Sequence, residues 1–195
     1  MSDKADSNKM VKENALINAA FELFSKSGIN GTAIDEIVKK AGVAKGTFYL
    51  YFKDKYDILD RIVIKKSAML IQNALTEMSG RKFDSGTDKI LFFINYIIDT
   101  LTQSRILLKI LYKNLSLGLY RRVMDDPVRG AEFRQIVGEF NRLREGGSKE
   151  ENGYLLFILL EMTGSVCYSA ILYGEPAPID QMKPILLKTV RKILS

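Results

Sequence analysis

Two short amphipathic segments separated by Gly42 constrain the fold of this chain more than any other feature. In the first segment, Ile34 and Ile37 recur at helical spacing and give it an apolar face. Gly42 then interrupts the pattern, because glycine adopts the left-handed conformation that ends a helix at little cost. A second short helix is expected from about residue 44 to residue 52. Two short helices joined by a glycine turn predict a helix-turn-helix over residues 33–52.

The rest of the chain also shows helical periodicity. Only 4 of its 195 residues are proline and 47% are apolar, which is enough to build a core. We expect an all-α fold of about nine helices, with an N-terminal three-helix helix-turn-helix domain followed by a C-terminal helical bundle. Residues 1–8 are expected to fray. Outside residues 33–52, helices are expected at about 9–27, 54–78, 87–103, 104–116, 149–173 and 179–194, with a further helix between Pro127 and Gly147.

The net charge of +6 is concentrated in one part of the chain. Residues 39–66 hold eight lysine and arginine side chains against three aspartates. Such an excess attracts polyanions, nucleic acid first and membrane surfaces second. Taken alone, the charge is equally consistent with a solvated helix face.

Histidine is absent, and Cys167 is the only cysteine. Zinc sites built on histidine are therefore excluded, as are Ser-His-Asp and Cys-His catalysis, and we expect no catalytic residue, metal or cofactor. A single cysteine forms no intrachain disulfide, which is typical of a reducing cytosol. Residues 1–14 lack the apolar core of a signal peptide, and the longest uncharged run, 162–174, is too short to span a bilayer. We expect a cytoplasmic protein without a membrane segment.

The second short helix has the composition of a helix that enters the DNA major groove. Its apolar anchors, expected to lock it against the preceding helices, are Val43, Phe48 and Phe52. Small, polar and hydroxyl-bearing residues remain to face DNA, and these are Lys45, Gly46, Thr47, Tyr49 and Tyr51.

Residues 31–55 read GTAIDEIVKKAGVAKGTFYLYFKDK, and residues 20–24 read AFELF. With Gly28, these strings resemble the DNA-binding domain of the TetR family. The family pattern places threonine at the start of helix two, followed by Ile-Ala-x-x-Ala-Gly-Val and then Lys-Gly-Thr-hydrophobic-Tyr-x-His-Phe. The resemblance covers roughly residues 10–70.

Two positions depart from that pattern: Tyr51 stands where histidine is common, and Val38 where alanine is common. Tyr51 keeps a hydroxyl for a phosphate, so DNA binding is still expected. The resemblance implies phosphate contacts at the start of helix two, close approach of a glycine to base edges, and a phosphate clamp of tyrosines and lysine. The implied DNA-binding residues are Thr32, Ala33, Ala44, Lys45, Gly46, Thr47, Tyr49, Tyr51 and Lys55. Three structural alternatives stay open: Thr32 as a helix cap only, Tyr49 as part of the core, and Lys55 as a free surface lysine.

The resemblance also implies a division of the chain into two domains. Residues 10–70 are expected to form the DNA-binding domain, and residues 71–195 a domain for effector binding and dimerisation. Most aromatic residues of the second domain are expected to lie in its core. Glu161 is the most informative polar residue there, because it interrupts an apolar stretch and must be paired, solvated or functional.

Five residues are candidates for binding an effector: Tyr96, Asp99, Phe157, Glu161 and Tyr168. In this hypothesis Glu161 contacts a cationic small molecule. The alternatives are a hydrogen bond within a dimer interface and a group that faces solvent. Arg105 and Lys109 are the candidates for an anionic effector, although solvent exposure is the commoner role of such side chains.

A homodimer formed through the last two helices is the final implication of the resemblance. The small residues Gly164, Ser165, Ser169 and Ala170 permit close helix packing there. A two-fold dimer places two recognition helices about one DNA turn apart, which fits a palindromic operator in double-stranded DNA. The expected function is a repressor that a small-molecule effector releases from DNA. Two alternatives stay open: a regulator of the same fold that responds to a protein partner, and an enzyme built on a helical bundle.

Overall fold

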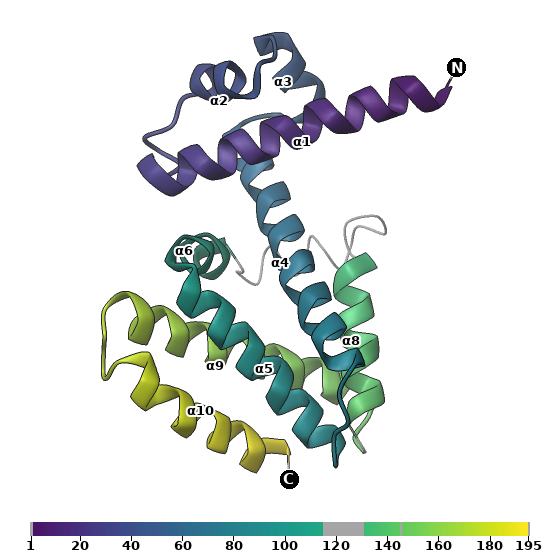
Figure 1. Ribbon diagram of the computed structural model, residues 1–195, viewed down its shortest axis with the longest axis vertical. Coiled ribbons are helices and arrows are strands. Elements are labelled where there is room, and N and C mark those ends of the chain that lie inside the picture. Colours follow the sequence, from purple (N-terminus) through teal and green to yellow (C-terminus); the bar gives the residue numbers. More distant parts are fainter. Residues whose placement is uncertain (1, 115–130, 145, 195) are drawn as a thin grey trace. The chain divides into compact units, whose positions relative to one another are not determined.

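A computed structural model describes residues 2–114, 131–144 and 146–194. These parts form nine helices and no strand, so the predicted all-α fold is confirmed (Figure 1). The chain divides into two compact units, residues 1–65 and residues 66–195. The helix break expected near Pro127 lies outside the described residues.

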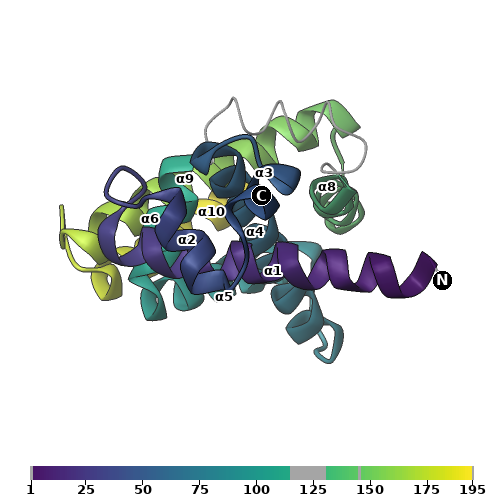
Figure 2. The same ribbon diagram turned by 90° about the horizontal axis from the view of Figure 1, so that it is seen from above.

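The first unit contains α1 (Ser2–Ser27), α2 (Ile34–Ala41), α3 (Lys45–Tyr51) and the beginning of α4 (Lys55–Ser79). Helix α2 lies against α1, and Figure 2 shows the two helices next to each other in the view from above. The side chains that form the core of this unit come from all four helices and include Leu16, Ile17, Ala20, Phe24, Ile37, Phe48, Phe52, Ile58 and Ile62. A core shared by four helices holds the two short helices in a fixed arrangement.

Helix α1 starts at Ser2, so the prediction of a frayed segment over residues 1–8 is wrong. Residues 2–10 contain neither glycine nor proline, and the sequence therefore has nothing there that would end a helix. Val11, although apolar and spaced four residues from Ala15, is 62% exposed.

Helix α4 begins at an aspartate cap. The Asp54 carboxylate accepts hydrogen bonds from the backbone amides of Tyr56 and Asp57 at 2.7 and 2.9 Å. The Asp57 carboxylate in turn accepts from the backbone amide of Lys53 at 3.0 Å. This reciprocal pair satisfies amides that have no partner inside the helix.

The second unit is built around α9 (Lys149–Leu172). Helix α9 contacts α5 (Gly86–Gln103), α6 (Arg105–Asn114), α8 (Ala131–Leu143) and α10 (Ile179–Leu194). Figure 1 shows α5 and α10 side by side. The core of this unit includes Ile94, Ile98, Leu108, Phe140, Leu156, Leu159, Cys167, Leu186 and Val190.

Helix α9 is apolar on its outer side as well as its inner side. Its most apolar 18-residue window has a mean hydropathy of 1.9, so length and composition alone would let it cross a membrane. The uncharged run 162–174, on which the expectation of no membrane segment was based, therefore covers only part of this apolar helix. Within the folded unit α9 packs on four other helices, while Tyr154 and Ile158 on its outer side are exposed.

The small residues of α9 do not lie on one outward face, contrary to the expected packing stripe. Ala170 is only 4% exposed and belongs to the core of the unit. A side chain added at Gly164 would meet the ring of Tyr112 at 3.6 Å, so this position faces α6. Ser165 is exposed.

Candidate nucleic-acid interface

The turn between α2 and α3 depends on the backbone of Gly42. Its φ of +68° lies in the left-handed region, where other residues are strained. The amide of Gly42 donates to the Lys39 carbonyl at 3.3 Å, and the amide of Val43 donates to the Val38 carbonyl at 3.1 Å. These bonds end α2 and turn the chain directly into α3.

Phe48 fixes α3 against the rest of the unit. Its side chain is fully buried, and its ring lies 5.6 Å from the ring of Phe52, which is also buried. The Tyr49 ring packs edge-on against Phe48 at 5.4 Å while the Tyr49 side chain stays exposed. Tyr49 therefore both supports α3 and presents its hydroxyl outward, so the alternative that it is partly core is correct for one side of its ring.

The opposite face of α3 is open to solvent. Ala44, the N-cap residue of α3, is exposed, and so are Lys45 and Gly46. Leu50 is 80% exposed, and the sequence analysis did not include it among the candidates. Its position four residues after Gly46 places it on the same helix face, and that spacing was the available signal. An exposed leucine on such a face suits contact with a thymine methyl group.

Lys45 is held by an ion pair within this surface. Its ammonium lies 2.7 Å from the carboxylate of Asp35 on α2, and both side chains are mostly exposed. The hydrogen bond from Lys45 to Asp35 raises the pKa of Lys45, so the lysine stays charged. An exposed pair of this kind adds little stability. Its main consequence is to direct the ammonium across the gap between the two helices.

Gly46 lies inside α3 with nothing around it that requires a glycine. A side chain added at Gly46 would meet no atom of the described protein within 4 Å. Glycine in a helix costs roughly 0.5–1 kcal/mol relative to alanine. The protein accepts this cost although its own packing does not demand it, which is typical of a position that a ligand approaches closely.

Thr32 differs from its expected role as a helix cap. The Thr32 side chain is 2% exposed, and its hydroxyl donates to the Gly28 carbonyl at 2.8 Å, at the end of α1. The N-cap of α2 is Ala33, whose amide donates to the Glu36 carboxylate at 2.8 Å. The alternative that Thr32 caps α2 is therefore wrong, and the Thr32 hydroxyl points into the fold. Ala33 remains exposed at the start of α2.

The remaining predicted phosphate contacts are half-buried. Thr47, Tyr51 and Lys55 all have intermediate exposure. The Lys55 ammonium donates to the backbone carbonyls of Asn30 and Thr32, each at 3.4 Å. Lys55 is thus not a free surface lysine: it supports the segment before α2 while keeping its charge near the start of that helix.

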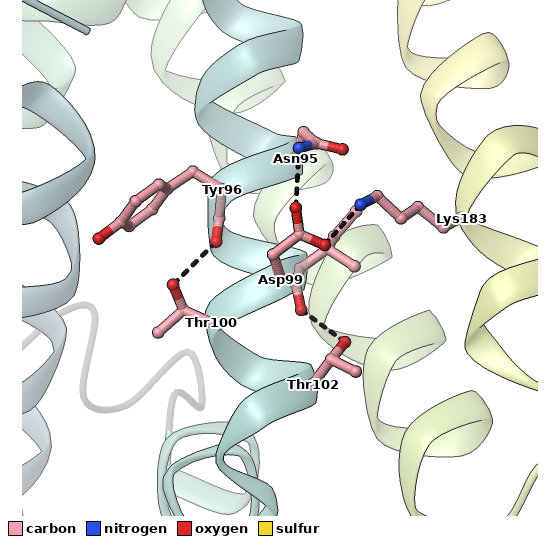
Figure 3. Close-up of polar contacts among 7 residues, drawn as sticks. Asn95, Tyr96, Asp99, Thr100, Thr102 and Lys183 are labelled. Atoms are coloured by element: carbon pink, nitrogen blue, oxygen red, sulfur yellow. Dashed lines mark hydrogen bonds and ion pairs between the residues drawn. The ribbon is translucent and has the colours of Figure 1, made fainter. Parts of the chain in front are cut away.

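Asp99, one of the predicted effector residues, contacts one residue of its own helix and one residue of α10 (Figure 3). Its carboxylate accepts from the Asn95 amide at 2.9 Å, and it forms an ion pair with Lys183 of α10. The Tyr96 side chain points away from both Asp99 and Lys183. Asp99 therefore links α5 to α10 in this structure.

The other three predicted effector residues, Phe157, Glu161 and Tyr168, lie on a different helix, α9. The Tyr168 ring stacks on Tyr112 of α6 at 4.2 Å, and its hydroxyl lies 3.3 Å from that of Tyr173. Glu161 is exposed on the outer side of α9, and Phe157 is half-buried. Asp99 and Tyr168 thus contact different helices, α10 and α6, while Glu161 is exposed.

The first unit is similar in sequence to DNA-binding regulatory proteins. A sequence model described as bacterial regulatory proteins, tetR family, matches residues 16–62. The HTH-type transcriptional regulator YvdT of Bacillus subtilis (strain 168) is 39% identical over 70 residues, which cover 36% of this chain and 34% of YvdT. The fatty acid metabolism regulator protein of the same organism is 41% identical over 64 residues, which are 33% of each chain. The matches thus span about a third of these relatives.

A likeness in fold covers both units. The crystal structure of FadR from Bacillus subtilis in complex with stearoyl-CoA has a TM-score of 0.64 and 18% sequence identity. The match covers 90% of this chain and 96% of that chain. At this identity the likeness concerns the fold alone.

Proposed function

Because this chain belongs to the TetR family of bacterial transcriptional regulators, we propose that it is a homodimeric repressor that binds a palindromic operator and is released by a small-molecule effector. The exposed face of α3 is the observation that carries the DNA-binding part of this proposal. This face presents a lysine, an unobstructed glycine, a tyrosine and a leucine on a short helix anchored by Phe48.

Each exposed group on this face has a counterpart in a DNA groove. Lys45 donates to guanine acceptors, Gly46 lets the backbone approach the bases, and Leu50 covers thymine methyl groups. Tyr49, Tyr51 and Lys55 contact phosphates, together with Ala33 at the start of α2, and set the register on the duplex. Residues 39–66 supply the positive charge that attracts the polyanion.

The proposed dimer forms through the outer faces of α9 and α10. Tyr154 and Ile158 on α9 and Ile185 on α10 are exposed apolar side chains of the second unit. Exposed apolar patches of this kind mark interaction surfaces. A second copy of the chain with two-fold symmetry would cover them and would place two copies of α3 on one operator.

Release by an effector requires that the ligand bind the DNA-bound and free states with different affinity. The proposed effector site lies in the second unit, and its signal reaches the first unit through α4, which begins in one unit and ends in the other. The FadR structure, which has a similar fold, is a complex with stearoyl-CoA, and this supports a ligand site in this fold. We place the protein in the cytoplasm, where its DNA target lies, and assign it no enzymatic activity.

Selection of duplexes from a random-sequence library tests the proposal. The purified protein should enrich an inverted repeat whose half-sites lie about one helical turn apart. Lys45→Ala should weaken binding to that site and relax the preference at one position in each half-site. The matched control is Lys82→Ala, which removes an exposed lysine of the second unit and should bind like the parent protein. Enrichment of no sequence, or equal loss in both variants, would contradict the assignment of α3.

A further inference from the structure

The second unit contains a small apolar chamber lined by residues of α4, α5, α8 and α9. Apart from Glu139, the described side chains that line it are aliphatic or aromatic, and they include Phe93, Phe140, Leu156 and Leu160. Its volume is about 30 Å³, which is enough for one or two water molecules but offers them almost no polar partner. A chamber of this composition favours hydrocarbon over water.

A wider and more polar vestibule adjoins the chamber. It has a volume of about 480 Å³ and shares Leu75, Glu139 and Leu143 with the chamber. Its other lining residues include the two cations Arg81 and Lys89. The two spaces are therefore adjacent, and joined together they would make a path from a charged entrance to an apolar interior.

The cations at the entrance outweigh the carboxylate that lines it. Arg81 is held over the ring of Phe92 at 4.6 Å and lies 3.6 Å from Glu77, a long exposed contact that screens it only weakly. Glu139 is itself paired with Arg142 of the same helix at 2.5 Å. The entrance thus keeps a positive excess for an incoming head group.

We propose that this path is the effector site and that the effector is an amphiphilic anion, an alkyl or acyl chain ending in an anionic head group. The chain enters the apolar chamber and the head group stays with Arg81 and Lys89 at the vestibule. This inference rests on the proposed function and names the class of its ligand. It also reverses the charge expected from Glu161, which lies exposed on the outer side of α9.

The chamber has to expand for this ligand, because about 30 Å³ does not hold an alkyl chain. Leu75 lines both spaces and belongs to α4. An alkyl chain that separates α8 from α5 and α9 would therefore also displace the end of α4. A ligand that expands the chamber thereby acts on the one helix that continues into the DNA-binding unit.

Calorimetric titration of the full chain, without DNA, tests the site with three dodecyl probes that differ only in the head group: dodecanoate, dodecanol and dodecyltrimethylammonium. Dodecanoate should bind tightest, and each CH₂ added between octanoate and dodecanoate should tighten binding about threefold to fourfold. A dodecanoyl thioester with a phosphorylated carrier distinguishes a free fatty acid from an acyl conjugate as the natural source. Tightest binding of the cationic probe, or no dependence on chain length, would overturn the proposal.

Variants locate the two ends of the ligand. Arg81→Gln and Lys89→Gln should each weaken dodecanoate about twofold to fivefold and leave dodecanol unchanged. Lys82→Gln is the matched control, since Lys82 is exposed and lines neither space, and it should bind dodecanoate like the parent protein. Leu160→Trp should shorten the longest chain accepted, and thermal melting checks that this variant folds. Equal loss in all three cation variants would overturn the assignment of the entrance.

Release from DNA is a separate readout. If dodecanoate binds with these dependences but leaves the selected operator complex intact, the site stands and the repressor mechanism fails. If the protein binds its operator but none of the probes, the ligand class is wrong and DNA binding stands.

Discussion

Substitution of Gly46 should affect the stability of the protein and its affinity for DNA in opposite directions. An alanine side chain at this position meets no described atom within 4 Å, so Gly46→Ala should stabilise the first unit by about 0.4–1 kcal/mol. The same methyl group should weaken operator binding at least tenfold, because it occupies space that the base edges need in the proposed complex. Urea unfolding and fluorescence anisotropy with the selected operator measure the two effects.

Gly138→Ala is the matched control for Gly46. Gly138 lies within α8 and also has no atom within 4 Å of an added side chain. The control should gain stability and retain its operator affinity. If Gly46→Ala binds the operator like the parent protein, Gly46 does not approach the bases and α3 has been given the wrong orientation.

Cys167 is a residue whose chemistry the fold suppresses. Its side chain is fully buried, and burial raises the pKa of the thiol to about 12. At pH 8 only about one thiol in ten thousand is then ionised, and the thiolate is the reactive form. Iodoacetamide should therefore modify Cys167 slowly in the native protein and rapidly in urea, as mass spectrometry would measure. Rapid native modification would show that α9 opens readily.

At the scale of helices, the sequence predicted elements better than it predicted their surroundings. The cap at Asp54 could be predicted because Asp54 and its partner Asp57 lie three residues apart in the sequence. The role of Thr32 could not, since its hydroxyl bonds to the end of α1 and leaves Ala33 and Glu36 to begin α2. Whether Thr32 or Ala33 caps α2 depends on the backbone path between α1 and α2, which the sequence does not specify.

The orientation of α9 shows a second limit. Glu161 is a carboxylate in the apolar middle of α9, and the sequence alone leaves open whether it is paired, faces solvent or binds a ligand. Because α9 is apolar on nearly every side, periodicity does not indicate which side faces the core. Leu159 and Cys167 define the inner side in the structure, and Glu161 and Ser165 lie on the outer one. The chamber could not be predicted either, because residues from four helices line it and the sequence does not show how these helices pack.

Helix α8 is fastened at its C-terminal end. A side chain at Gly86 would lie 1.8 Å from the Leu143 carbonyl oxygen, so the start of α5 meets the end of α8 at a distance that only glycine permits. Asn152 of α9, which is buried, donates to the Asn141 side chain at 2.9 Å and accepts from Arg144 at 2.5 Å. These contacts hold the same end of α8 that lines the chamber, through Phe140 and Leu143, so expansion of the chamber has to work against them.

Removal of Asn152 should loosen this fastening. Asn152→Ala leaves the polar groups of Asn141 and Arg144 without their buried partner, which should lower the free energy of unfolding by about 1–3 kcal/mol. Urea unfolding measures the loss. In a double-mutant cycle with Asn141→Ala, the two residues should show an interaction free energy of about 0.5–1.5 kcal/mol. Additive losses would mean that the Asn141–Asn152 hydrogen bond does not hold the helices together.

At the scale of the whole molecule, the proposed function needs two chains, and the proposed contact between them is formed by exposed apolar side chains of α9 and α10. Ala170 is unsuitable for testing this, because a charge there would enter the core of its own unit. Ile158 is 52% exposed on the outer side of α9, four residues from Tyr154 and three from Glu161. A substitution at Ile158 therefore tests the interface without disturbing the folded unit.

Ile158→Glu should split the proposed dimer. Two-fold symmetry would bring the new carboxylate close to its own copy and to Glu161, and burial of such charges without partners costs several kcal/mol. Sedimentation velocity should show a monomer, circular dichroism should show unchanged helix content, and operator affinity should fall because a single recognition helix then binds alone. Ile106→Glu is the control: Ile106 is 45% exposed on α6, and its variant should remain dimeric. A stable Ile158→Glu dimer would place the interface away from α9, and the apolar outer face of that helix would then need another partner.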